Sequence, residues 1–159
     1  MLILGCNTIG HLGAGIFDMQ RTGDDTSGKE WERTRRMGVN TLAFRLPQHG
    51  TFFTVDPDCV AITEAVDWQH TRQWLELVAG SRTALFVSVA TEALGPEQRA
   101  ALGRAFTLVQ SSGPELQEVP GLRPLDWRES TTPERWADGS GRAESFAWCE
   151  PEGAYPFST

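Results

Sequence analysis

The chain has 159 residues, of which 40% are hydrophobic and 22% charged, and its formal net charge is −7. This composition is that of a globular protein with an apolar core, and it excludes a disordered chain. The negative balance argues against a nucleic-acid partner, because nucleic-acid-binding proteins set basic patches against phosphate.

The cysteines and the first residues of the chain indicate the cellular compartment in which we expect the protein. Three cysteines without a CxxC pair predict reduced thiols and neither a zinc site nor a disulfide framework. The apolar run Met1–Cys6 is too short for a membrane span and lacks the basic residues of a signal peptide. We therefore expect a cytoplasmic protein without a membrane partner.

The first half of the chain alternates short apolar runs with glycine-rich or polar stretches. We expect a helix over Lys29–Met37, started by Thr26 or Ser27 and stopped by Gly38. The strands that we expect here, the first of them buried, are Met1–Cys6, Ile16–Thr22 and Val39–Arg45.

The second half opens with a loop over Leu46–Asp58. Asp67 is expected to cap a helix that runs to Ala79 before Gly80, and Pro96 to start a second helix. Thr83–Val89, between the two helices, is the clearest strand in the sequence.

Alternating strands and helices predict an α/β fold with a parallel sheet and helices outside it. The parallel neighbours should be Leu2–Cys6, Phe17–Gln20, Thr41–Arg45 and Ala84–Ser88. Prolines become frequent after Gln110, so we divide the chain into an α/β domain over 1–110 and a small β-rich appendage or tail over 111–159.

Two polar clusters stand out. Arg21–Gly28 follows an expected strand and precedes an expected helix, and active sites of parallel α/β folds lie at such junctions. The alternative is a helix-capping loop with solvated aspartates. His49–Asp58 contains the turn signal Asp-Pro-Asp, and its lone histidine is more often structural than catalytic.

These clusters carry a family resemblance. Leu4-Gly5-Cys6, Gly15-Ile16-Phe17-Asp18 and Arg21-Thr22-Gly23-Asp24-Asp25 resemble, in order and spacing, a segment of the clan-D α-galactosidases of the melibiase group. His49-Gly50 with Asp56-Pro57-Asp58, and Trp74 before Leu85–Ser88, are similar to later motifs of that family. The likeness covers about Leu2–Phe106. It implies the carboxy-terminal half of a (β/α)₈ barrel, since a complete barrel needs about 250 residues.

The resemblance also implies roles for single residues. Asp25 matches the family's acid/base aspartate, whereas Arg21, Asp58 and Asn7 match or lie beside positions that bind the sugar. An aromatic residue such as Trp31 or Phe52 would face the sugar ring. Neither a metal nor a cofactor is needed, and the substrate would be a carbohydrate of the α-galactoside type.

The family's nucleophilic aspartate has no counterpart in the chain, because it lies on an earlier barrel strand. Asp24 stands where many members have proline, and Val55 where they have asparagine, so the exact sugar stays open. The alternatives are a non-catalytic truncated product, or one half of a split barrel completed by an upstream half-barrel chain or a homo-oligomer. A carbohydrate-binding module is disfavoured by the expected helices.

Overall fold

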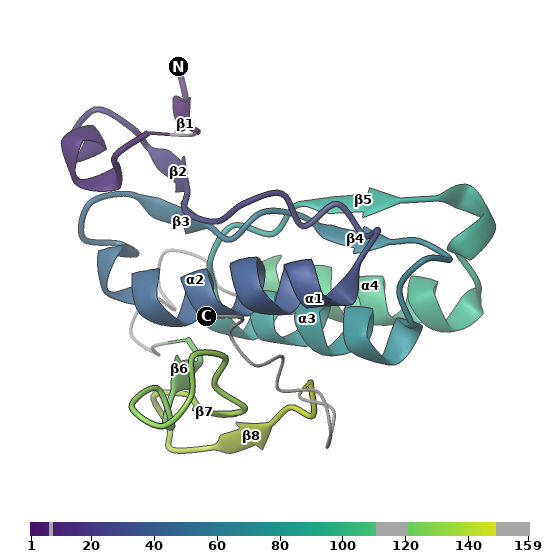
Figure 1. The fold of residues 1–159 in the computed structure, drawn as a ribbon. Helices are drawn as coiled ribbons and strands as arrows, with labels where there is room; N and C mark the ends of the chain where they lie inside the picture. The colour runs from purple at the N-terminus through teal and green to yellow at the C-terminus, as the bar shows by residue number, and fades with distance from the viewer. Residues whose placement is uncertain (7, 111–120, 149–159) are drawn as a thin grey trace, which may run out of the picture.

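In the computed structural model, which describes residues 1–6, 8–110 and 121–148, short parallel strands form one layer of the molecule (Figure 1). Three of them pair in the order β1-β2-β3, and two more pair as β4-β5. Their bounds are Leu4–Gly5 (β1), Met19–Arg21 (β2), Thr54–Asp56 (β3), Val60–Ile62 (β4) and Val87–Val89 (β5).

The two groups of strands are continuous with each other through β3 and β4. Only residues 57–59 separate these strands in the chain. The N–H of Ala84 donates to the carbonyl of Val55 at 3.0 Å, and the N–H of Val60 donates to the carbonyl of Phe86 at 2.8 Å. The segment that leads into β5 therefore runs beside both β3 and β4, and the spatial order of the strands equals their order in the chain.

Helices cover one face of this strand layer (Figure 1). The first helical stretch is continuous: it is α-helical at its two ends and π-helical between them. The bounds are Trp31–Arg33 (α1), Thr34–Val39 (π-helix), Asn40–Arg45 (α2), Trp68–Ser81 (α3) and Pro96–Gln110 (α4), with 3₁₀ turns at Gly10–Gly13, Leu46–Gln48 and Thr91–Ala93.

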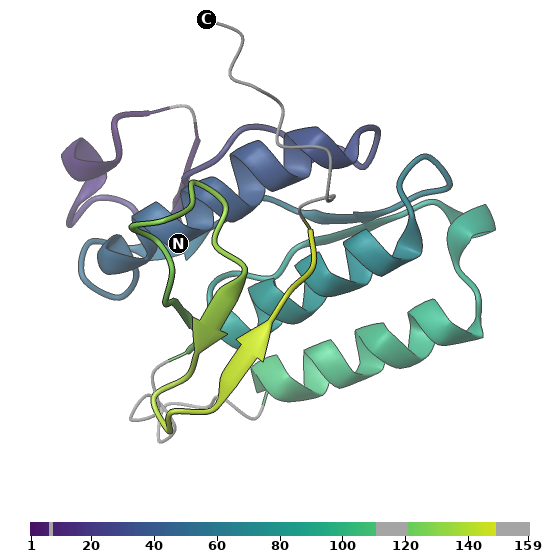
Figure 2. The same cartoon turned by 60° about the horizontal axis from the view of Figure 1, so that its bottom comes forward.

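A small antiparallel sheet lies on the other side of the helices (Figures 1 and 2). Its strands are Arg123–Pro124 (β6), Arg135–Ala137 (β7) and Ala143–Ser145 (β8), paired in the order β6-β7-β8. Trp136 and Trp148 are almost fully buried and belong to the same hydrophobic cluster as the helices. The β-rich segment is therefore joined to the α/β part through a shared core.

The expected strand over Val39–Arg45 is wrong, because this segment continues the first helix as α2. Its buried positions are Val39, Leu42, Ala43 and Leu46, which are three and four residues apart. That spacing forms one stripe on a helix, and it outweighs the local strand-like alternation. Besides β1, the strand that pairs with β2 is β3, within the expected loop over Leu46–Asp58.

Gly38 does not end the helix as expected. A Cβ atom at this position would lie 3.0 Å from Cζ2 of Trp74 and 3.2 Å from the methyl carbon of Thr26. The missing side chain thus lets the first helix pack directly on α3 and on the loop after β2. Thr26 and Ser27 do not cap the helix either, since its N-cap is Glu30.

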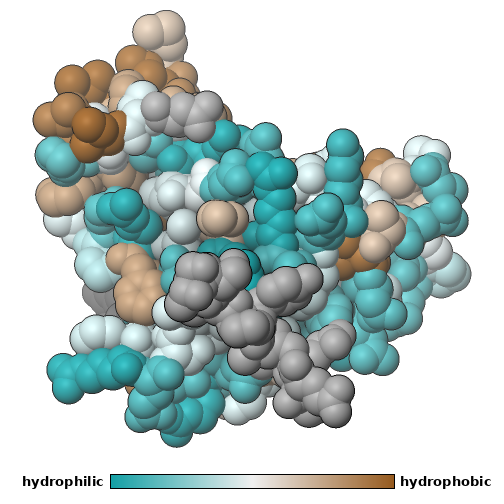
Figure 3. Space-filling view, viewed as in Figure 1, coloured by the Kyte–Doolittle hydropathy of each residue, from teal (hydrophilic) through white to brown (hydrophobic). Residues whose placement is uncertain are grey.

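The expected buried strand at the start of the chain is also corrected, because β1 is an exposed edge strand. Leu4 is 47% and Leu2 70% exposed. They belong to an apolar surface over β1 and the turn after it, the brown area at the upper left of Figure 3. This surface comprises Met1, Leu2, Leu4, Ile9, Leu12 and Ile16.

The later helices agree with the sequence-based expectations. The Asp67 carboxylate accepts a hydrogen bond from the N–H of Gln69 at 2.7 Å and caps α3. The helix ends at Ser81, one residue past Gly80, with Arg82 in the left-handed conformation. Pro96 is the first residue of α4.

Two glycines with similar backbone angles test how tightly the loop after β2 packs. Gly28 has φ +69° and Gly50 has φ +71°, but only at Gly28 would a Cβ collide, at 2.6 Å from the Cβ of Ala61. We expect Gly50→Ala to lower the free energy of unfolding by about 1 kcal/mol, the cost of positive φ. Gly28→Ala should cost roughly 2–4 kcal/mol, because overpacking adds to that strain. Urea unfolding of both variants measures the difference, and equal losses would contradict close packing at Gly28.

Candidate functional site

The polar cluster after β2 meets the turn after β3 at the carboxyl ends of these neighbouring strands. Arg21 and Asp56, the last residues of the two strands, stand opposite each other in the parallel register. Nη1 of Arg21 lies 2.5 Å from Oδ1 of Asp25 and 3.8 Å from Oδ1 of Asp58. One guanidinium therefore contacts two carboxylates that are 33 residues apart in the chain.

A turn between β3 and β4 sets the position of Asp58. Its φ is +74°, in the left-handed region that aspartate tolerates better than most residues. Oδ2 of Asp58 accepts the backbone N–H of Thr26 at 2.6 Å. The buried Thr26 hydroxyl donates to the carbonyl of Cys59 at 2.6 Å. The loop that carries Asp25 is thereby fastened to the turn that carries Asp58.

The exposures of the three side chains differ. The side chain of Asp25 is 60% exposed, whereas those of Arg21 and Asp58 are 17% and 16% exposed. The cluster thus presents the accessible carboxylate of Asp25, which is held in place by the less exposed side chains of Arg21 and Asp58. Its chemistry is that of hydrogen bonding to hydroxyl groups and of proton exchange with a bound molecule.

Asp56 is a member of the site that sequence reasoning treated as part of a turn. It is 3% exposed, and its Oδ1 accepts the backbone N–H of Asp58 at 2.9 Å. Burial raises the pKa of the Asp56 carboxyl, and the negative charge of Asp58 adds to this effect. The sequence signal for it was its place at the end of a strand, which the misassigned strand over Val39–Arg45 concealed.

Asp24 is paired with a different arginine from its neighbour Asp25. Its Oδ2 accepts a hydrogen bond from Nη2 of Arg33 at 2.7 Å. A backbone hydrogen bond from Asp25 and the contact with Arg33 hold the pKa of Asp24 below its usual range. The two adjacent carboxylates thus belong to separate ion pairs.

Asn7, expected to bind the sugar, lies outside the described residues. Beside that loop, Gln20 is a buried polar residue that the sequence did not single out. Its Oε1 accepts a hydrogen bond from the hydroxyl of Thr8 at 2.9 Å, and its Nε2 donates to the carbonyl of Arg21 at 2.7 Å. Gln20 therefore connects the loop after β1 with the end of β2.

The aromatic residues expected at the sugar ring are not grouped with the cluster. Trp31 stacks on His70 with ring centroids 4.5 Å apart, and its Nε1 donates to the carbonyl of Trp148 at 3.4 Å. Phe52 has Phe53 as its aromatic neighbour, at 6.2 Å. The role of Trp31 in this structure is to join the first helix to α3 and to the segment after β8.

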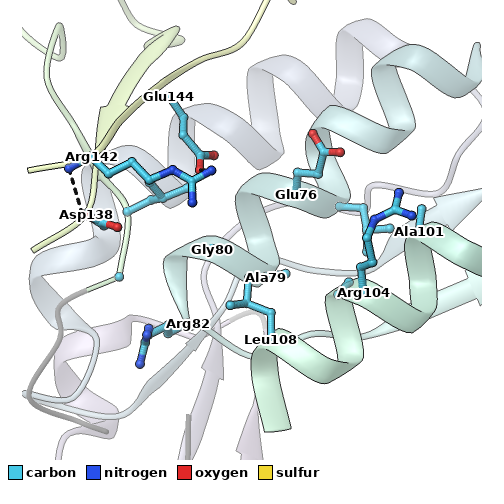
Figure 4. A pocket seen from close by; sticks show the side chains of 14 residues that line it. Glu76, Ala79, Gly80, Arg82, Ala101, Arg104, Leu108, Asp138, Arg142 and Glu144 are labelled. Atoms are coloured by element: carbon cyan, nitrogen blue, oxygen red, sulfur yellow. Dashed lines mark hydrogen bonds and ion pairs between the residues drawn. The ribbon is translucent and has the colours of Figure 1, made fainter. Parts of the chain in front are cut away.

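A hollow of about 500 Å³ opens elsewhere, between α3, α4 and the β7–β8 hairpin (Figure 4). Its charged lining residues balance, with three arginines and three carboxylates. Within it, Asp138 accepts three hydrogen bonds from its own turn, and Arg142 lies 3.3 Å from Glu144. The loops around Arg21 contribute no lining residue, so the hollow and the Arg21 cluster are separate. We place the candidate site at the Arg21 cluster, because there an arginine meets two aspartates at the carboxyl ends of neighbouring parallel strands. The charged lining residues are Glu76, Arg82, Arg104, Asp138, Arg142 and Glu144.

Comparison of the chain with protein-family models and with curated proteins finds no match. Across residues 1–6, 8–110 and 121–148, no group of three or more histidine, cysteine or acidic side chains is arranged to hold a metal ion. Within the same ranges, no helix has the length and apolarity to cross a membrane.

His49 lies beside β3 and has a structural role, from which a pH dependence of stability follows. Its Nδ1 accepts the N–H of Val55 at 3.1 Å, so this nitrogen carries no proton. Burial lowers the pKa of His49, and the nearby charge of Arg123 lowers it further. The unfolded chain therefore binds a proton at a higher pH than the folded one does.

The free energy of unfolding contributed by His49 should be fully present above about pH 6.5 and lost as the pH falls toward the lowered pKa of the folded protein. Urea unfolding at pH 7.5 and 5.5 measures this loss. In His49→Gln the pH dependence should be smaller. An equal dependence in the variant and the native chain would contradict a neutral, buried His49.

Proposed function

We propose that this chain is part of a retaining glycoside hydrolase that acts on α-galactoside-like substrates, with Asp25 as the acid/base and without the nucleophile. The observation that carries the proposal is the cluster of Arg21, Asp25 and Asp58 at the carboxyl ends of adjacent parallel strands. Catalytic groups of (β/α)₈ barrels lie at that end of their strands.

The arrangement of strands and helices supports a barrel segment over a doubly wound sheet. Doubly wound folds reverse their strand order and carry helices on both faces. Here the strands follow one another without reversal, and α1–α2, α3 and α4 lie on one face (Figure 1). Right-handed crossovers that advance in one direction put every helix outside the sheet, as in a barrel.

The contacts of the cluster suggest a division of roles. Asp25, the most exposed of the three, protonates the glycosidic oxygen and later takes the proton from water. Oδ2 of Asp58 is engaged by Thr26, which leaves Oδ1, the atom facing Arg21, to accept a sugar hydroxyl. Arg21 orients both carboxylates through its planar set of donors.

The second carboxyl of a retaining pair must lie about 5–5.5 Å from the first. Neither neighbouring carboxylate suits that role. Asp56 is buried and bonded to the backbone of its own turn, and Asp24 is held by Arg33. The nucleophile of the proposed reaction therefore comes from outside the described residues.

A second candidate is that the chain acts as one half of a split barrel, completed by an upstream half-barrel chain or by a second copy. Among the described strands, β1 and β5 each pair on one side only. Leu4 on β1 and Phe86 beside β5 are 47% and 41% exposed. Unpaired parallel edges with exposed apolar residues favour association with further strands.

The catalytic proposal predicts that the chain alone releases no p-nitrophenol from p-nitrophenyl α-galactoside, because no glycosyl-enzyme forms. Azide is a small anion that can occupy the place of the absent nucleophile, and with it the chain should form β-galactosyl azide. With phenyl α-galactoside, a poorer leaving group that needs an acid, Asp25→Asn should lower the azide-dependent rate by about 10²–10⁴-fold.

Asp24→Asn is the matched control, since Asp24 is also paired with an arginine and adjoins Asp25. The azide-dependent rate of this variant should differ from that of the native chain by less than about threefold. Product identification by NMR checks the stereochemistry. Hydrolysis without azide that Asp25→Asn abolishes would contradict the absence of the nucleophile. No azide-dependent product, with no binding of methyl α-galactoside, would overturn the proposed activity.

The split-barrel candidate predicts association through the β1 edge. Leu4→Lys puts a charge on the edge strand and should shift the chain toward monomer in light scattering after gel filtration, because edge charges oppose strand pairing. Phe106→Lys, at a similarly exposed apolar position on α4 (43%), should leave association unchanged. Loss of association in both variants, or in neither, would exclude pairing at β1.

A further inference from the structure

A second hollow, of about 460 Å³, lies where the end of the first helical stretch meets β6 and the turn after it. Its volume is within the range of small-molecule sites, about 300–1,000 Å³. Six of its seven lining residues are apolar. The lining residues are Ala43, Phe44, Leu46, Pro47, Arg123, Pro124 and Trp127.

Two aromatic side chains of this hollow remain accessible. Phe44 is 44% and Trp127 46% exposed, and they come from segments more than 80 residues apart in the chain. Arg128, which is not among the lining residues, lies over the indole of Trp127 at 4.9 Å from the ring centroid. The walls thus offer apolar surface beside positive charge.

Arg123 is the one charged residue among those that line the hollow. Within the described residues its guanidinium has a single hydrogen bond, from Nη1 to the carbonyl of Leu46 at a long 3.4 Å. Burial lowers the pKa of Arg123, although arginine stays charged in proteins. A partly desolvated cation with unused donors is stabilised by an anion, and its planar fork matches a carboxylate.

The nearest acidic residues of the turn are engaged elsewhere. Asp126 accepts the backbone N–H groups of Glu134 and Arg135 at 3.2 and 3.1 Å. Glu129 lies 3.4 Å from the guanidinium of Arg135. These carboxylates hold the turn against β7, so they do not neutralise Arg123.

We propose that this hollow binds a small amphiphilic carboxylate, whose head pairs with Arg123 and whose apolar body packs between Phe44 and Trp127. One guanidinium in apolar surroundings balances a single negative charge. A phosphate dianion would need further donors, such as backbone N–H groups at a helix start. The site uses none of the residues of the Arg21 cluster, and its occupancy does not depend on the proposed hydrolase activity.

Calorimetry with three probes on the full chain tests the proposal. Octanoate carries both the head and the apolar body, octanamide lacks the charge, and acetate lacks the body. We expect saturable binding of octanoate, with octanamide and acetate each weaker by at least about tenfold, since charged hydrogen bonds and buried apolar groups each contribute on that scale.

Arg123→Gln should weaken octanoate binding by roughly 10- to 100-fold and leave octanamide binding unchanged. Trp127→Ala removes an exposed side chain, so the fold should persist, and should weaken octanoate and octanamide alike. Arg104→Gln, which alters an arginine of the other hollow, is the matched control and should bind octanoate as the native chain does (Figure 4). Near-ultraviolet circular dichroism establishes that each variant is folded.

The proposal is overturned if octanoate does not bind saturably at millimolar concentration, or if octanamide binds as tightly as octanoate. Equal affinity of the native chain and Arg123→Gln for octanoate would show that Arg123 does not pair with the carboxylate. Equal affinity for acetate and octanoate would show that the apolar walls do not contribute to binding.

Discussion

The carboxylate of Asp58 binds the backbone N–H of Thr26 at 2.6 Å, and much of the candidate site depends on this contact. It requires the left-handed turn between β3 and β4, which interrupts the strand and directs the carboxylate toward the neighbouring loop. The same carboxylate reaches Arg21, which in turn pairs with Asp25. The loop after β2 is held at further points as well, since the Thr63 hydroxyl donates to the carbonyl of Gly28 and Arg33 donates to Asp24.

The turn between β3 and β4 is also held by a tryptophan of α3. Trp74 is 1% exposed and donates from Nε1 to the carbonyl of Cys59, in the turn that carries Asp58. The glycine at position 38 allows the first helix to lie against this ring. A bulky side chain at position 38 would therefore disturb both the helix packing and the backbone beneath the site, since close-packed interiors transmit volume changes.

The exposed surfaces of the molecule differ in the kind of binding partner that they favour. The strand layer has helices on one face and unpaired edges at β1 and β5 among the described residues, which suits completion by more strands. The hollow beside Arg123 instead combines accessible aromatic side chains with one partly buried cation, which suits a small ligand. The residues that line this hollow differ from those of the β1 and β5 edges.

Local signals were enough to predict α3 and α4, because Asp67 and Pro96 act on the residues next to them. The apolar runs and polar stretches also predicted that strands and helices alternate along the chain. The state of Val39–Arg45 was decided by tertiary structure, because its apolar residues fit either a short strand or a helical stripe, and burial of Val39, Leu42 and Leu46 in the core selects the helix.

The join of Asp58 to Thr26, the burial of Asp56 and the meeting of Arg123 with Leu46 were likewise beyond local pattern. The two hydrogen bonds join residues 32 and 77 positions apart, and nothing in the sequence near either partner specifies the other. The sequence alone indicated the polar cluster Arg21–Gly28 at the end of an expected strand, whereas it marked Asp56 only as part of a turn. Only the packing of the strands against the helices decided which of these residues share a site, because burial and long-range hydrogen bonds exist only in the folded chain.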